Sequence, residues 1–259
     1  MCFDLDSQPP IQPIAGGAID TEEVILRAGD GGRFAGLLAR AEEPIGAGVV
    51  VLPDVRGLHP YYEELALRFA EAGIDAVAID YFGRTAGIGV RERSDDFDFM
   101  THVADTRFSS LSWDVQAAAE RLRSLGEGRG RAIFAIGFCF GGRLAFMTAT
   151  MDLDLAGVIG FYGWPTGSAR SDVPAPADST GLMRGSVLWI FGGADRGIPA
   201  EAVETFEAAL SAAGVPNEIV TYPGAPHSFF DRKQEDYAEA SADAWERVLD
   251  FIRANTPGA

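Results

Sequence analysis

The chain has 259 residues, of which 47% are hydrophobic, enough for the core of one large domain. Its 38 acidic and 21 basic residues give a net charge of −17, so its surface repels nucleic-acid phosphates and anionic lipids. We therefore expect no nucleic-acid or membrane partner, and a pocket for an anionic substrate would need a cationic group of its own.

The start of the chain predicts neither export nor membrane insertion. Residues 1–13 contain two aspartates, no basic cluster and no apolar run of signal-peptide length. We expect a cytoplasmic protein whose residues 1–20 are loosely ordered, with Cys2 facing solvent. The two cysteines, Cys2 and Cys139, are too few for a disulfide framework and too far apart for a C-x-x-C pair.

A β-hairpin is the first predicted element. Residues 23–28 and 33–39 flank a glycine-rich turn at 29–32. Six runs that are apolar almost throughout follow, as expected for strands covered on both faces: residues 48–52, 75–79, 132–136, 156–161, 187–191 and 218–222.

Helical patterns separate these strands. They cover residues 61–72, 112–125, 142–151, 200–213 and 235–254. The alternation predicts a single α/β domain over residues 1–259, with a mostly parallel sheet of about eight strands and helices on both faces. Ligands should then bind at the carboxyl ends of the strands.

Two long stretches interrupt this alternation. Residues 83–111 and 163–185 exceed the usual loop length, and long loops in a compact domain often form lids or pocket walls. For residues 168–180, rich in small and polar side chains, a solvated excursion is an equal alternative.

The strongest local motif is G-F-C-F-G-G at residues 137–142, between a predicted strand and a predicted helix. It matches the nucleophile elbow of G-x-S-x-G type with sulfur in place of oxygen. The turn is so tight that Gly137 and Gly141 are required, and Gly142 allows the helix to pack close to the strand. At a helix N-terminus, Cys139 would be favoured as a thiolate. The alternatives are a buried structural cysteine and a dinucleotide-binding loop, although the glycine spacing does not fit G-x-G-x-x-G.

An acid and a histidine follow in the order that this type of site uses. Asp195 comes just after the strand at 187–191, and His227 just after the strand at 218–222. Taken singly, Asp195 could cap the helix ahead of Pro199, and His227 could be an ordinary loop histidine. Together, the three placements predict a Cys-His-Asp triad at the strands' carboxyl ends.

An oxyanion hole needs two backbone N–H donors, and the sequence offers Phe140 and Val55. Phe140 follows the nucleophile, and Val55 follows the third predicted strand. Asp54 beside it has two interpretations: its carboxylate keeps the thiol protonated until substrate arrives, or it caps a turn.

The chain resembles the dienelactone hydrolase family in these motifs and in its opening Met1-Cys2-Phe3 run, over nearly its whole length. Members of that family are monomeric or weakly associating α/β-hydrolases. They open unsaturated lactones or cleave related esters with a Cys-His-Asp triad, without metal or cofactor. The resemblance implies a small-molecule ester or lactone as substrate, no cofactor or metal, and a monomer or weak homodimer.

The same resemblance assigns site residues. Cys139, His227 and Asp195 look like the family's triad, and Val55 and Phe140 look like its oxyanion donors. These matches imply an acyl-enzyme mechanism on an α/β-hydrolase fold.

The family's best-known branch holds a substrate carboxylate with a glutamate after the third strand and two arginines. Asp54 stands in the glutamate's place, and Arg84 resembles the first arginine. Asp231 occupies the place of the second, with Arg232 one residue further on. An aspartate there repels a carboxylate, so recognition of a dienelactone carboxylate is in question. Arg84 has the alternative of a surface salt bridge.

Aromatic residues near the predicted strand ends indicate an aromatic pocket wall, with plain core as the alternative. They are Phe82, Phe138, Phe140, Tyr162, Trp164 and Phe229. We take Tyr162 and Trp164 as candidate substrate-binding residues beside Asp54 and Arg84. His59 and His102 have no partner that the sequence identifies.

The predicted function is therefore hydrolysis of a lactone or small carboxylic ester. Two alternatives remain open. One is acyl transfer by the same triad to an acceptor other than water, and the other is a non-catalytic protein that binds ligands in the same pocket.

Overall fold

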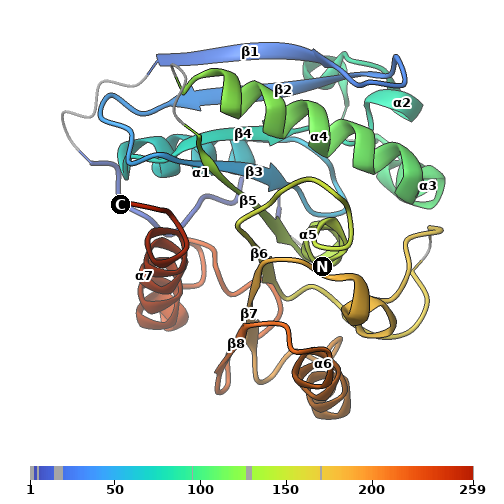
Figure 1. The fold of residues 1–259 in the computed structure, drawn as a ribbon, viewed down its shortest axis with the longest axis vertical. Helices are drawn as coiled ribbons and strands as arrows, with labels where there is room; N and C mark the ends of the chain where they lie inside the picture. The colour runs from blue at the N-terminus through green and yellow to red at the C-terminus, as the bar shows by residue number, and fades with distance from the viewer. Residues whose placement is uncertain are drawn as a thin grey trace.

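A computed structural model describes residues 3–4, 6–14, 20–94, 96–126, 130–169 and 171–258, so Cys2 lies outside the described residues. The described residues form an eight-stranded sheet between two layers of helices (Figure 1). Its strands are β1 (Asp20–Arg27), β2 (Arg33–Arg40), β3 (Ala47–Leu52), β4 (Asp75–Ile79), β5 (Ala132–Phe138), β6 (Gly157–Phe161), β7 (Ser186–Gly192) and β8 (Asn217–Tyr222).

The strands lie in the order β1-β2-β4-β3-β5-β6-β7-β8. Strand β2 runs antiparallel to both β1 and β4, and the other neighbours pair in parallel. Every residue of β3, β4 and β6 is buried, because helices cover both faces of the central sheet. The predicted hairpin and the predicted α/β-hydrolase fold are confirmed.

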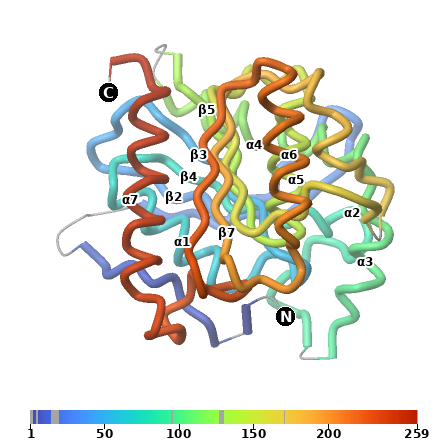
Figure 2. Tube along the Cα trace, turned by 90° about the horizontal axis from the view of Figure 1, so that it is seen from below, coloured from blue at the N-terminus to red at the C-terminus, as the bar shows by residue number. Residues whose placement is uncertain are grey.

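Helices α1 and α7 cover one face of the sheet, and α4, α5 and α6 cover the other (Figure 2). The helices are α1 (Pro60–Glu71), α2 (Gly83–Ala86), α3 (Phe99–Asp105), α4 (Phe108–Ser124), α5 (Phe140–Thr148), α6 (Ala200–Ala213) and α7 (Ala238–Ala254). Short 3₁₀ helices lie at η1 (Val90–Glu92), η2 (Pro176–Leu182) and η3 (Glu235–Tyr237). None of the helices described is both long and apolar enough to cross a membrane.

The long stretch at residues 83–111 contains short helices of its own. Asp98 caps α3 by accepting a hydrogen bond from the backbone N–H of Thr101. Helix α4 begins at Phe108, earlier than the predicted residue 112, because Leu111 already packs into the core. This stretch, which follows the carboxyl end of β4, is therefore partly helical.

The described part of the N-terminal segment contains packed residues, and loose order across residues 1–20 as a whole stays a prediction. Phe3 is 2% exposed, and its ring stacks on Tyr61 with centroids 3.8 Å apart. The backbone of Gln8 donates to Asp231 and accepts from Arg232. The sequence did not predict this packing because the segment has no periodic apolar pattern, only isolated residues that fill a gap in the core.

Candidate active site

Cys139 lies at the junction between strand β5 and helix α5. Its φ of 55° and ψ of −115° are strained for a residue with a side chain. A Cβ at Gly137 would overlap the carbonyl of Gly141, and a Cβ at Gly141 would overlap the carbonyl of Pro53. The requirement for glycine at both positions is thereby confirmed, and it holds the cysteine on a sharp bend.

Asp195 and His227 form a short hydrogen bond. His227 Nδ1 lies 2.6 Å from Asp195 Oδ2, and the other carboxylate oxygen accepts the N–H of Gly197 at 2.8 Å. Asp195 is 6% exposed, whereas a quarter of the imidazole reaches solvent. The carboxylate is therefore fixed from both sides and orients the ring.

The loops that carry these two residues are held against each other by backbone contacts. The N–H of Ala194 donates to the carbonyl of Ala225 at 3.0 Å. Gly192 has no room for a Cβ, because that atom would overlap the same Ala225 carbonyl. The acid and the histidine are thus brought together by their backbones as well as by their own hydrogen bond.

Cys139 and His227 line one cavity of about 400 Å³. Four other predicted site residues line it as well: Val55, Phe140, Tyr162 and Trp164. The ring of Tyr162 lies 4.9 Å from the imidazole between centroids. Trp164 is 50% exposed at this cavity, so a large apolar surface there is open to a ligand.

Both long stretches that interrupt the strand-helix alternation, residues 83–111 and 163–185, contribute residues to the cavity wall. Met100 and Val103 come from helix α3, and Ser168 and Ala169 come from the stretch after β6. The lining is mostly apolar, which suits a small organic substrate. Of the two interpretations of residues 168–180, the pocket wall is supported at Ser168 and Ala169.

The backbone positions of Val55 and Phe140 suit donation into this cavity. Phe140 is the first residue of α5, whose first N–H groups have no partner within the helix. Val55 lies in the turn after β3, a turn closed by a hydrogen bond from Gly57 N to Asp54 O at 3.1 Å.

Asp54 is fully buried and is not among the described residues that line the cavity. One of its carboxylate oxygens accepts the N–H of Arg56 at 2.9 Å, and the other accepts the N–H of Phe3 at 3.2 Å. These bonds support the turn-capping interpretation. His59 Nε2 lies 3.8 Å from the same carboxylate.

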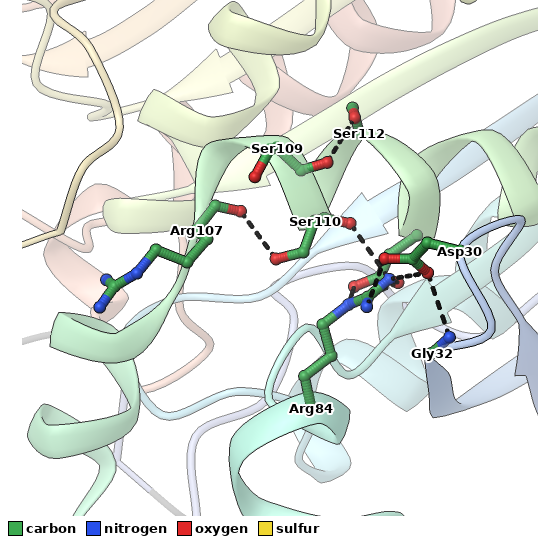
Figure 3. A network of polar contacts seen from close by, with 8 residues as sticks. Asp30, Gly32, Arg84, Arg107, Ser109, Ser110 and Ser112 are labelled. Atoms are coloured by element: carbon green, nitrogen blue, oxygen red, sulfur yellow. Dashed lines mark hydrogen bonds and ion pairs between the residues drawn. The ribbon is translucent and has the colours of Figure 1, made fainter.

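Arg84 is bound by two carboxylates, and Figure 3 shows the contact with one of them, Asp30. Its Nη1 lies 2.7 Å from Asp30, and its Nη2 lies 2.7 Å from Asp114. Burial raises the pKa of Asp114 to about 6. Arg84 lines a separate hollow of about 10 Å³, so its position does not support the predicted substrate contact, and the salt-bridge alternative describes it.

The remaining residues in question serve the structure around the site. Asp231 accepts the backbone N–H groups of Gln8 and Lys233, and it is not among the cavity-lining residues described. His102 Nδ1 lies 2.9 Å from Thr85 Oγ1. Within the described ranges, no group of three or more His, Cys, Asp or Glu side chains is placed to hold a metal ion.

The sequence analysis missed Arg143, a buried arginine in the cavity wall, 3% exposed, one helical turn after the nucleophile. The sequence did hold one signal for it, because Arg143 is a single charged residue near the start of an otherwise apolar helix. Met100, Val103 and Ile198 were missed as well, and nothing in a single sequence marks such residues as pocket lining.

Comparison with known proteins gives consistent matches over almost the whole chain. The model of the dienelactone hydrolase family matches residues 34–256. A Salmonella typhimurium protein with the provisional name carboxymethylenebutenolidase is 30% identical, over 94% of this chain and 93% of its own. The carboxymethylenebutenolidase of Rhodococcus opacus is 28% identical, over 83% and 84%.

Solved structures agree with these sequence matches. The crystal structure of a Klebsiella pneumoniae protein, provisionally named a dienelactone hydrolase, superposes with a TM-score of 0.77. The two sequences are 27% identical, and the match covers 91% of this chain and 99% of the other.

Proposed function

This chain belongs to the dienelactone hydrolase family, and from that premise we propose that it hydrolyses a lactone or small carboxylic ester with Cys139 as nucleophile. One observation carries the proposal. Cys139, on a strained strand-to-helix bend, lines the same cavity as His227, and the Nδ1 atom of His227 is 2.6 Å from the buried carboxylate of Asp195. This arrangement suits nucleophilic catalysis through a triad.

The backbone around Cys139 is suited to stabilise negative charge that develops during the reaction. The residue directly precedes the first turn of α5, where unpaired N–H groups and the helix dipole stabilise negative charge. The same N–H groups are suited to stabilise an oxyanion on the substrate. Phe140 N–H and Val55 N–H are the donors we assign to this role.

Asp195 sets the tautomer of His227 in this mechanism. With its Nδ1 proton directed at Asp195, the imidazole presents Nε2 as the basic atom. Nε2 would take the proton from the Cys139 thiol and hold it for the leaving group.

The proposed reaction has two steps. The Cys139 sulfur attacks the carbonyl carbon, the oxyanion forms and collapses, and His227 Nε2 protonates the departing alkoxide, which leaves a thioester on the cysteine. His227 then removes a proton from water, the resulting hydroxide attacks the thioester, and the carboxylic acid leaves as the thiol is restored.

Tyr162 and Trp164 are the substrate-binding residues that the cavity supports. Their rings offer apolar surface beside the nucleophile and the histidine. A small-molecule ester or lactone remains the proposed substrate. A monomer or weak homodimer and a cytoplasmic location stay predictions.

The test is turnover of a panel of 4-nitrophenyl esters and unsaturated lactones by wild type, Cys139→Ala and His227→Ala. We expect wild-type turnover and losses of roughly 10³-fold or more in kcat for both variants. If Cys139→Ala retained wild-type turnover, the proposal would be wrong. Ester products formed with added methanol would indicate acyl transfer, and ligand binding without turnover would indicate the non-catalytic alternative.

A further inference from the structure

Arg143 is a buried cation whose hydrogen bonds, among the described residues, all go to backbone carbonyls. Its Nη1 lies 3.3 Å from the carbonyl of Trp164 and 3.2 Å from that of Thr166. Its Nη2 lies 2.9 Å from the carbonyl of Gly167 and 3.1 Å from that of Val173. Burial without a hydrogen-bonded carboxylate lowers the pKa of this guanidinium.

The bonds of Nη2 close a loop in the cavity wall. Gly167 and Val173 flank residues 168–172, and both carbonyls meet the same nitrogen. Ser168 and Ala169, in the closed loop, line the cavity. A planar guanidinium fixes such a loop more strictly than a flexible ammonium would, because its donors keep a set angle.

The helix that carries the nucleophile also carries Arg143. The backbone N–H of Arg143 donates to the carbonyl of Cys139 at 3.2 Å, which completes the first turn of α5. The stretch after β6 touches the same turn, since a Cβ at Gly142 would lie 2.9 Å from the Cα of Gly163. The positions of the nucleophile and of the wall are therefore set by one rigid element.

The wall has other anchors, which limit what Arg143 controls. Ala177 N donates to the carbonyl of Pro165 at 2.9 Å, and Phe108 N donates to the carboxylate of Asp172 at 2.8 Å. These bonds hold the outer part of the stretch. Arg143 instead holds the carbonyls of Gly167 and Val173, which lie on either side of the cavity-lining Ser168 and Ala169.

We propose that Arg143 is a positioning residue that pins residues 164–169 and 171–173 as a wall of the catalytic cavity and so sets how tightly the enzyme holds substrates that reach this wall. The inference rests on the proposed ester hydrolysis at Cys139. Arg143 acts through the wall and leaves the reactivity of the thiol unchanged.

The test compares Arg143→Met with Arg123→Met as a matched control. Arg123 also donates to two loop carbonyls, those of Leu153 and Asp154, but it is not among the cavity-lining residues described. Four quantities are measured: KM and kcat for 4-nitrophenyl hexanoate, the rate of Cys139 labelling by iodoacetamide, and hydrogen exchange of peptides covering residues 164–173.

For Arg143→Met we expect KM to rise about tenfold and kcat to change less than about threefold, because binding at the wall is lost while the thiol stays intact. Iodoacetamide is too small to need the wall, so its labelling rate should stay within about twofold. Amides in residues 164–173 should exchange faster. Arg123→Met should leave all four quantities near wild-type values.

Two results would overturn the proposal. One is a labelling rate that falls in step with kcat, because Arg143 would then act on the thiol. The other is unchanged exchange at residues 164–173 or an unchanged KM in a folded variant. If Arg143→Met does not fold, Arg143→Lys replaces it in the same comparison, because lysine keeps the positive charge but lacks the planar set of donors of the guanidinium.

Failure of the proposed function gives a different pattern. In that case the wild type would hydrolyse no ester, or Cys139→Ala would keep its turnover. Hydrogen exchange in the Arg143 and Arg123 variants would still decide whether the wall is pinned.

Discussion

Replacement of Asp195 by asparagine tests the geometry of the proposed triad in detail. Asp195 uses one oxygen for His227 Nδ1 and the other for the N–H of Gly197. In Asp195→Asn, the amide oxygen should stay with Gly197, because that N–H can only donate. The amide NH₂ would then face the histidine and force Nδ1 to accept, which moves the ring proton to Nε2.

The size of the effect follows from this change of tautomer. An imidazole protonated on Nε2 cannot take the proton of the thiol, so the nucleophile loses its base. The corresponding change in a serine triad costs about 10⁴-fold in kcat. A cysteine is partly ionised on its own at neutral pH, so we expect a loss of roughly 10²- to 10⁴-fold, or about 3–5.5 kcal/mol in activation free energy.

The assay is hydrolysis of 4-nitrophenyl butyrate over a range of pH, with circular dichroism to check the fold. The matched control is Asp231→Asn, because Asp231 is as buried as Asp195 and also accepts backbone N–H groups. We expect the control to stay within about threefold of wild type. Equal losses in the two variants, or an Asp195→Asn enzyme with nearly full kcat, would refute the reasoning.

Four further predictions concern the surroundings of the site. In Gly141→Ala the new Cβ overlaps backbone, so the variant should lose at least about 3 kcal/mol of stability and melt roughly 6–12 °C lower in calorimetry; a melting temperature near wild type would contradict the elbow geometry. Phe3→Ala should cost about 3–5 kcal/mol by urea unfolding, because the ring is buried against the core, and a loss below 1 kcal/mol would show that the segment is loosely held. Arg84→Met should leave the kcat/KM ratio between 4-nitrophenyl hemisuccinate and butyrate within about twofold, since its guanidinium is already bound by two carboxylates; a selective loss with the hemisuccinate would place Arg84 on the substrate. Burial raises the pKa of Asp114 to about 6 in the folded protein, so the stability that this group contributes near pH 4 is lost as the pH rises through 6. Asp114→Asn should therefore make the melting temperature depend less on pH, and an unchanged pH dependence would show that other groups cause it.

Much of the fold could be predicted because central strands and amphipathic helices leave strong periodic patterns. Strand β4 and helix α6 begin and end where the sequence predicted. The elbow was predictable because its glycines are required by sterics alone. The short helices in residues 83–111 were not, since caps and turns decide them.

Tertiary contacts decided the rest of the site. Arg84 has the sequence position expected for substrate binding, but only the folded structure shows Asp30 and Asp114 around it. Asp54 could not be assigned because its partner, the N–H of Phe3, lies 51 residues away in the chain. Arg143 was missed for the same reason, since all four of its carbonyl partners lie in another loop.

The most direct measurement is mass spectrometry of the enzyme quenched during turnover of 4-nitrophenyl butyrate. A butyryl group carried by the peptide that contains Cys139, formed and lost at rates that match turnover, is the predicted result. Steady hydrolysis with the acyl group on another residue, or with no adduct under conditions that trap thioesters, would contradict covalent catalysis by this cysteine.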